Sequence, residues 1–215
     1  MRYIAWAAML CVCVPAVAGT VSPVRIGDVP VGHWNANRDT KVYDNTASYT
    51  GYYYPGGADV EDDIHVDPHQ PFVMTGFSFG YYDSVATPPT NYVSATITFY
   101  EWTSDFQVPG AVLAGPYTLF GIPSPGAWIL SYQPDPVVLP PDFWMGVSFL
   151  DPDYPDAGLM IYGPPAIGTS HDLFMQDKQG PYSVSPVSDF CLAVSTPEPA
   201  SLLLLGVTGL LIRRR

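Results

Sequence analysis

A short segment near residue 60 concentrates the side chains of this sequence that could bind a metal ion. It comprises Asp59, Glu61, Asp62, Asp63, His65, Asp67 and His69. Adjacent carboxylates repel one another unless a cation or solvent relieves them, and calcium prefers carboxylate and carbonyl oxygens. A structural calcium site formed by Asp59, Glu61, Asp62 and Asp63 is therefore one candidate. The spacing matches no EF-hand loop, however, which favours a solvated acidic turn instead.

The histidines of the same segment offer a second chemistry. Imidazole and carboxylate are ligands that zinc accepts, so His65, Asp67 and His69 form a second candidate set. Pro68 argues against this set. Proline interrupts a strand, and the interruption would prevent the two imidazoles from pointing to one place.

Tyrosines are dense on both sides of this segment: Tyr49, Tyr52, Tyr53, Tyr54, Tyr81 and Tyr82. Flat rings can stack on the faces of sugars, so Tyr52, Tyr53 and Tyr54 are candidate glycan-binding residues. The alternative is that these tyrosines pack between sheets and keep their hydroxyls at the rim.

Motifs for catalysis are absent from the sequence. It contains no Gly-x-Ser-x-Gly elbow, phosphate-binding loop or His-Glu-x-x-His pair. Glu101 and Asp105 could act on a glycoside, but neither carries a signal of the burial or like-charge neighbour that raises a carboxyl pKa. We predict a protein that is not an enzyme.

The elements that position these residues have a period of two, which is typical of strands. In the first of them Val73, Thr75, Phe77, Phe79 and Tyr81 are predicted to share one face, with Met74 on the other. Together with shorter runs they predict seven or eight strands, at 73–81, 93–100, 128–132, 143–149, 159–162, 173–176 and 190–194. Proline- and glycine-rich turns separate them, and no amphipathic helix stands out. This pattern predicts one all-β domain over residues 19–195, an antiparallel β-sandwich of jelly-roll type.

The N-terminus has the parts of a secretory signal peptide: a basic start, a short apolar run and a small-x-small site ending at Ala18. We predict a signal over residues 1–18. Cys11 and Cys13 fall inside it, which leaves only Cys191 in the domain and no internal disulfide.

The C-terminal segment, residues 196–215, has three parts in a fixed order. Pro197, Glu198 and Pro199 precede an apolar stretch over 200–212, and the chain ends at Arg213, Arg214 and Arg215. As a helix the apolar stretch would reach about 20 Å, short of the roughly 30 Å hydrocarbon core of a bilayer. We predict a transient membrane helix with its arginines on the cytoplasmic side.

These three parts resemble the PEP-CTERM sorting signal of Gram-negative and related bacteria. In that family an exosortase, a membrane-embedded cysteine peptidase, is thought to process the tail at Pro-Glu-Pro. The resemblance implies that the secretion machinery and an exosortase are partners, and that the chain is anchored transiently in the inner membrane. It implies a destination at the cell surface, outer membrane or extracellular matrix, in association with exopolysaccharide. Residues 43–45 and 143–147 are similar to segments of uncharacterised sandwich domains that precede such tails.

Charge limits the range of partners. The whole chain has a net charge of −12, and four of its eight basic residues lie in the two terminal segments. Residues 19–195 keep four basic residues against nineteen acids, because Glu198 lies in the tail, and so have a net charge of −15. Such a surface repels nucleic acid, whose phosphates supply most of the attraction in its complexes. We expect an exported, non-catalytic surface or matrix protein, with a carbohydrate-binding module as the alternative.

Overall fold

The computed structural model describes residues 21–25, 39–83, 92–103, 108–123, 125–150, 157–183 and 189–197, of which 21–25 and 92 are described by their backbone alone. The predicted signal peptide and residues 198–215 lie outside the described residues. The described part of the chain contains no α-helix, and hence no helix that could span a membrane.

The first sheet contains eight strands arranged around β6 (Gly76–Asp83). One edge of β6 pairs with β9 (Gly126–Tyr132). Its other edge pairs first with β16 (Leu192–Pro197) and then with β12 (Ala157–Tyr162), so the sheet divides into two branches. The remaining strands are β1 (Val21–Arg25) on β9, β2 (Asp39–Asp44) on β16, and β3 (Tyr49–Tyr53) and β15 (Asp189–Phe190) on β12.

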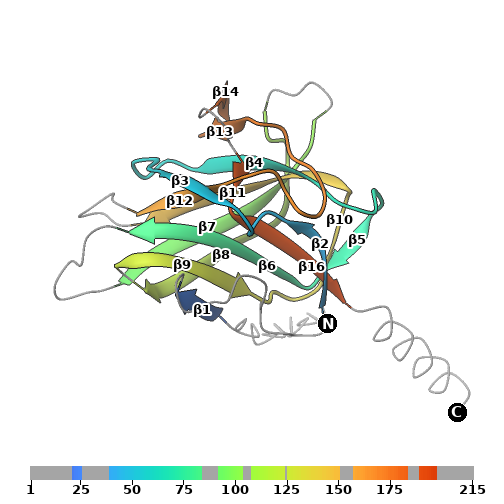
Figure 1. Ribbon diagram of the computed structural model, residues 1–215. Coiled ribbons are helices and arrows are strands. Elements are labelled where there is room, and N and C mark those ends of the chain that lie inside the picture. The colour runs from blue at the N-terminus through green and yellow to red at the C-terminus, as the bar shows by residue number, and fades with distance from the viewer. Residues whose placement is uncertain are drawn as a thin grey trace, which may run out of the picture.

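The second sheet contains six strands in the order β14-β13-β4-β11-β7-β8, and all its pairings are antiparallel. Its strands are β4 (Val60–His65), β7 (Tyr92–Glu101), β8 (Val112–Pro123), β11 (Asp142–Leu150), β13 (Phe174–Gln176) and β14 (Gln179–Tyr182). A small third sheet joins β5 (Phe72–Met74) to β10 (Val137–Leu139). Figure 1 shows β13 and β14 at the top of the molecule and β1 at the bottom.

The two larger sheets share one hydrophobic core. Phe77 of β6 contacts Phe99 of β7 with ring centroids 5.3 Å apart, and Phe79 of β6 lies 6.3 Å from Phe149 of β11. All four rings are buried. Burying each such side chain contributes about 1.5–3 kcal/mol. Because Cys191 is a free thiol, no disulfide assists this core among the described residues.

The predicted all-β, antiparallel fold is confirmed. The segments at 93–100, 128–132, 143–149, 159–162 and 173–176 fall in β7, β9, β11, β12 and β13. The structure has more strands than the seven or eight predicted, sixteen among the described residues. The longest of them, β8, was missed because Gly115-Pro116 and Gly121 resemble turn signals. It forms the edge of its sheet, where a proline is tolerated.

The segment predicted as one strand over 73–81 is divided. β5 ends at Met74 and pairs with β10, whereas β6 begins at Gly76 and belongs to the first sheet. Met74 is fully buried while Val73 is only half-buried, so before Gly76 it is Met74, and not Val73, that faces the core. The predicted assignment of faces is therefore wrong for these two residues. It is correct for Phe77, Phe79 and Tyr81, which lie in the core.

Candidate functional site

The acidic segment forms an interior strand of the second sheet. β4 lies between β11 and β13. Val60, Asp62 and Ile64 pair with the core residues of β11, and so face the interior. Glu61, Asp63 and His65 face the opposite side. The three acids of β4 are buried, at 0–1% exposure, which excludes the solvated turn for them.

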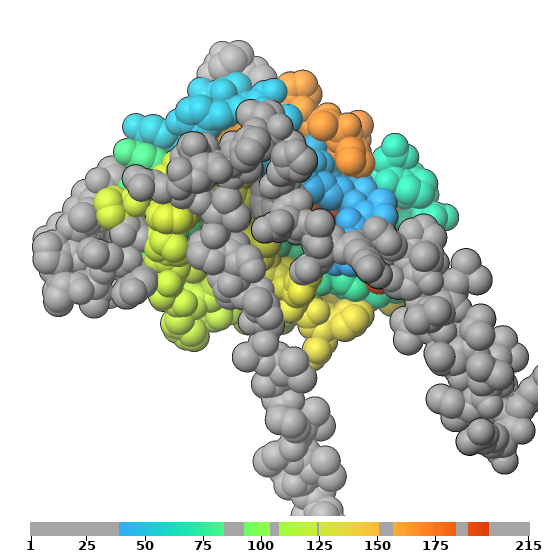
Figure 2. All heavy atoms as spheres, turned by 60° about the horizontal axis from the view of Figure 1, so that its bottom comes forward, coloured from blue at the N-terminus to red at the C-terminus, as the bar shows by residue number. Residues whose placement is uncertain are grey.

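The segment that joins β12 to β13, residues 163–173, is fixed beside β4; we call it the His171 loop. His65 N donates to Thr169 O and Thr169 N donates to His65 O, both at 2.9 Å. On the other side of the loop, Asp44 N donates to Ile167 O at 3.0 Å. Figure 2 shows the orange surface that follows β12 beside the blue surface of β2 and β3. The loop thereby brings His171 to a strand 106 positions earlier in the sequence.

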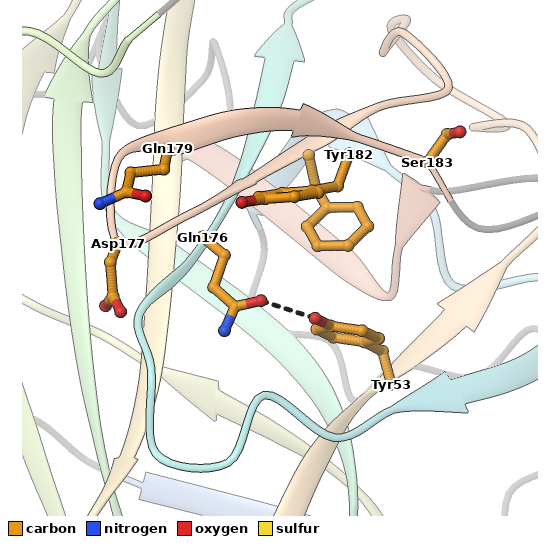
Figure 3. Close-up of a pocket in the computed structure, with 7 residues that line it drawn as sticks. Tyr53, Gln176, Asp177, Gln179, Tyr182 and Ser183 are labelled. Carbon is orange, nitrogen blue, oxygen red and sulfur yellow. Dashed lines mark hydrogen bonds between the residues drawn. The ribbon is translucent and has the colours of Figure 1, made fainter.

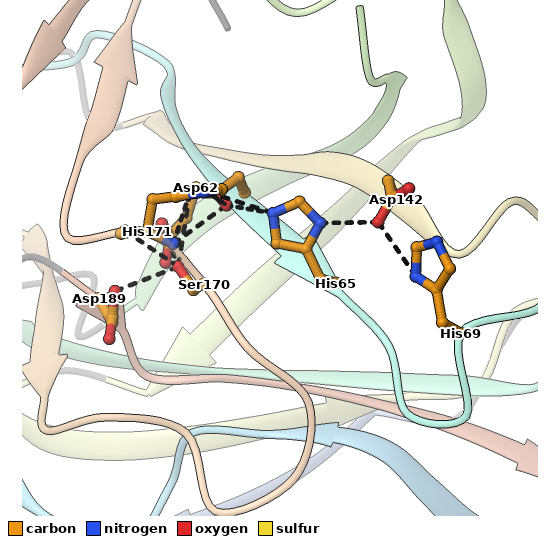
Figure 4. A network of polar contacts seen from close by, with 8 residues as sticks. Asp62, His65, His69, Asp142, Ser170, His171 and Asp189 are labelled. Carbon is orange, nitrogen blue, oxygen red and sulfur yellow. Dashed lines mark hydrogen bonds and ion pairs between the residues drawn. The ribbon is translucent and has the colours of Figure 1, made fainter. Parts of the chain in front are cut away.

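Three side chains converge where the loop meets the strand, and Figure 4 labels the two histidines among them, His65 and His171. Asp63 Oδ2 lies 2.8 Å from His65 Nε2 and 2.8 Å from His171 Nδ1. The two imidazole nitrogens are 3.3 Å apart. The backbone N–H of His171 also donates to Asp63 Oδ2 at 3.1 Å. We call Asp63, His65 and His171 the histidine–aspartate triad.

A second carboxylate orients His65 from its other side. His65 Nδ1 lies 2.7 Å from Asp142 Oδ1, so Nδ1 carries the proton because a carboxylate only accepts. His69 Nδ1 approaches the same oxygen at 3.5 Å. Burial lowers the pKa of His65, but the hydrogen bonds and charges of Asp63 and Asp142 outweigh it and the net pKa is raised.

On the interior side of β4, Asp62 belongs to a second polar network, and the hydroxyl of Ser170, 3.5 Å from Asp63 Oδ1, links this network to the triad. Its Oδ2 accepts a hydrogen bond from Phe190 N at 2.8 Å, and the hydroxyl of Ser170 lies 3.1 Å from Asp189 Oδ1 and 3.5 Å from Asp62 Oδ1. Burial and the charges of Asp63 and Asp189 raise the pKa of Asp62. Burial also raises the pKa of Asp189 to about 6. The buried hydroxyl of Tyr43 faces these carboxylates without a hydrogen bond of normal geometry.

Glu61 belongs to a third group, at the start of β4. Lys178 N donates to Glu61 Oε1 at 3.1 Å, and the hydroxyl of Tyr100 donates to Asp59 Oδ2 at 2.9 Å. Burial and the nearby charge of Asp59 raise the pKa of Glu61 to about 8. Burial and the same carboxylate raise the pKa of Tyr100 to about 12. The ammonium of Lys178 lies 4.2 Å from the centre of the Tyr100 ring.

The four acids predicted to bind calcium therefore do not meet at one point. Asp59 and Glu61 form one group, Asp62 lies in the interior network and Asp63 belongs to the triad. Of the predicted zinc ligands, His65 is in the triad, whereas Asp67 is exposed and His69 lies beside Asp142. Sequence reasoning missed His171 and Asp142, because no local spacing links either residue to β4.

The predicted glycan-binding tyrosines lie on two faces of β3 and at its end. Tyr53 lines a pocket of about 340 Å³ beside β13 and β14, together with Phe174, Gln176, Asp177, Gln179, Tyr182 and Ser183 (Figure 3). Its hydroxyl donates to Gln176 Oε1 at 2.6 Å. Tyr52 faces away from this pocket, stacks on Tyr82 at 5.1 Å and meets Tyr54 edge to face. The three rings do not form one flat surface.

The remaining candidates are dispersed. Glu101 is exposed at the end of β7, and Asp105 lies outside the described residues. Pro197 is the last residue of β16 and pairs with Asp39, so the first proline of the predicted sorting motif adjoins the sheet. Glu198, Pro199 and Arg213 to Arg215 lie outside the described residues.

Comparison of the chain with known protein families, curated proteins and solved structures finds no match.

Proposed function

We propose that this chain is an exported, non-catalytic surface or matrix protein whose domain, a β-sandwich of jelly-roll type, binds a neutral polysaccharide in the Tyr53 pocket. An exosortase-type system would process its C-terminal tail after export. The proposal joins the two functions that the sequence suggests, a surface protein and a carbohydrate-binding module, and assigns the binding to one place.

The composition of the pocket carries this proposal. Tyr182 lines the pocket and is 45% exposed, with its ring centroid 5.8 Å from that of Phe174. Phe174 lies in turn 4.9 Å from Tyr53. Gln176, Asp177 and Gln179 add donors and acceptors around these rings. An aromatic face bordered by a few amide and carboxylate groups suits a sugar, which has an apolar face and a rim of hydroxyls.

Charge selects the class of polysaccharide. Residues 19–195 carry a net charge of −15, and Asp177 lies at the pocket itself. An anionic polysaccharide would be repelled over the Debye length, which is about 8 Å at physiological salt. A neutral polymer avoids this repulsion, so we expect dextran- or cellulose-type glycans to bind and uronic-acid polymers not to bind.

Affinity electrophoresis tests the proposal. The native protein should migrate more slowly in gels that contain a neutral polysaccharide, such as hydroxyethyl cellulose or dextran, than in gels without it. Tyr182→Ala should abolish the retardation. Tyr49→Ala is the matched control, because Tyr49 is also an exposed tyrosine, at 53%, but contacts Tyr162 instead of the pocket. Equal retardation of both variants, or none of the wild type across a panel of neutral glycans, would contradict the proposal.

A further inference from the structure

We propose that Asp63, His65 and His171 bind a divalent transition-metal ion of the zinc class. Their ligand atoms form a triangle with sides of 2.8, 2.8 and 3.3 Å. An ion at a bonding distance of about 2.1 Å from all three would lie about 1 Å out of their plane. Tetrahedral ligands at that distance are about 3.4 Å apart, so the two imidazoles nearly have this spacing and the carboxylate needs to move by about 0.6 Å.

Packing and hydrogen bonds hold the imidazoles in this orientation. Asp142 accepts the Nδ1 proton of His65 and leaves Nε2 directed at the triad, the carboxylate–histidine arrangement that commonly supports metal-bound histidines. The indole of Trp102 stacks on His171 at 6.0 Å with an interplanar angle of 12° and meets His65 edge to face at 4.9 Å. Trp144 stacks in turn on Trp102 at 5.1 Å.

The backbone also fixes the triad. The two hydrogen bonds between His65 and Thr169 tie the His171 loop to β4, and His171 N donates to the Asp63 carboxylate. The ligands therefore come from two elements whose relative position is set by main-chain contacts. Such preorganisation lowers the entropic cost of assembling a site.

Electrostatics favours a cation at this point. Two imidazole nitrogens approach the same oxygen of Asp63, and each needs a proton there to form a hydrogen bond. Two N–H groups would then converge with their nitrogens 3.3 Å apart. A single dication replaces both protons and bonds to all three atoms. The carboxylate of Asp142, which contacts His65, adds further negative charge.

The ligand types identify the class of ion. Two imidazoles and one carboxylate suit Zn²⁺ and neighbouring first-row ions, whereas Ca²⁺ prefers oxygen ligands alone. Asp63 is fully buried, but the side chain of His171 remains 43% exposed. An ion could therefore enter from the side of His171 and keep water as its fourth ligand.

Titration of the metal-stripped full chain in detergent, with Zn²⁺ competed against a chromophoric chelator, tests the site. We expect one Zn²⁺ per chain. His171→Ala should weaken binding by more than about 100-fold, and Asp142→Asn, which removes the carboxylate that orients His65 but none of the three ligands, by about 10- to 100-fold. His69→Ala is the matched control, because His69 is 66% exposed and also approaches Asp142 but lies outside the triad. The affinity of this variant for Zn²⁺ should equal that of the wild type.

Binding that is absent, that survives His171→Ala, or that is lost equally in His69→Ala would overturn the proposal. A stoichiometric response to Ca²⁺ with none to Zn²⁺ would also overturn it. If circular dichroism shows that His171→Ala is unfolded, the visible absorption spectrum of the wild type with Co²⁺ tests the site instead. The intense visible absorption of tetrahedral Co²⁺, with quenching of tryptophan fluorescence by the ion near Trp102, supports the site, and the weak spectrum of hydrated Co²⁺ contradicts it.

Discussion

Replacing Glu61 by glutamine should make the protein more stable at neutral pH and leave its stability unchanged in acid. Glu61 is 0% exposed, and burial with the charge of Asp59 raises its pKa from 4.5 to about 8. Between these two values the folded protein holds a proton that the unfolded chain has released. The free energy of unfolding therefore falls as the pH rises through this window.

The size of the effect follows from the width of the window. Each unit of pKa difference corresponds to about 1.4 kcal/mol. At pH 7.5 Glu61 lowers the free energy of unfolding of the wild type by at most about 4 kcal/mol. Because Glu61 and Asp59 influence each other's ionisation, we expect Glu61→Gln to recover about 2–4 kcal/mol. Glutamine is neutral at every pH, and its carbonyl can still accept the hydrogen bond from Lys178 N.

Urea denaturation at half-unit steps from pH 4.5 to 8 measures the difference directly. The two proteins should have equal free energies of unfolding near pH 4.5. Above this pH, Glu61→Gln should become steadily more stable than the wild type. Glu101→Gln is the control, because Glu101 is exposed at the end of β7 and its replacement should leave the pH dependence unchanged. Parallel curves for the wild type and Glu61→Gln, or a variant that is less stable at pH 8, would contradict a raised pKa of Glu61 in the folded protein.

Two further predictions concern the His171 loop and the sorting tail. Gly168→Ala should lower the free energy of unfolding by about 2–3 kcal/mol in urea, because φ is +77° and a Cβ would lie 2.6 Å from His65 O. Gly56→Ala, with φ +65° and no atom within 4 Å of a Cβ, should lose only about 1–2 kcal/mol, so equal losses would count against the close contact. Glu198→Ala should leave export intact but change the mass of the mature protein in its native host. Unchanged processing by mass spectrometry would contradict the exosortase proposal.

The strands that the sequence predicts well are those with one face in the core. Phe143, Met145, Val147 and Phe149 alternate along β11 and are all buried, so a period of two identifies the strand without any tertiary information. β8 has no such signal, because as an edge strand it exposes apolar residues such as Phe120, at 79%. Its glycines and Pro116 then indicate a loop.

β4 was predicted least accurately, because its environment is not local. Consecutive acids indicate a solvated surface unless distant groups surround them. Here those groups are Phe190 N, 128 positions from Asp62, and Lys178 N, 117 positions from Glu61. The segment was recognised as the chemically important one, but neither the burial of its acids nor the arrival of His171 can be derived from spacing.

Anomalous X-ray diffraction at the zinc absorption edge, from crystals grown with Zn²⁺, shows whether the histidine–aspartate triad holds an ion. We expect one strong peak per chain, about 2.1 Å from Asp63 Oδ2, His65 Nε2 and His171 Nδ1. A triad without a peak, or a peak only between His69 and Asp142, would contradict the proposed site.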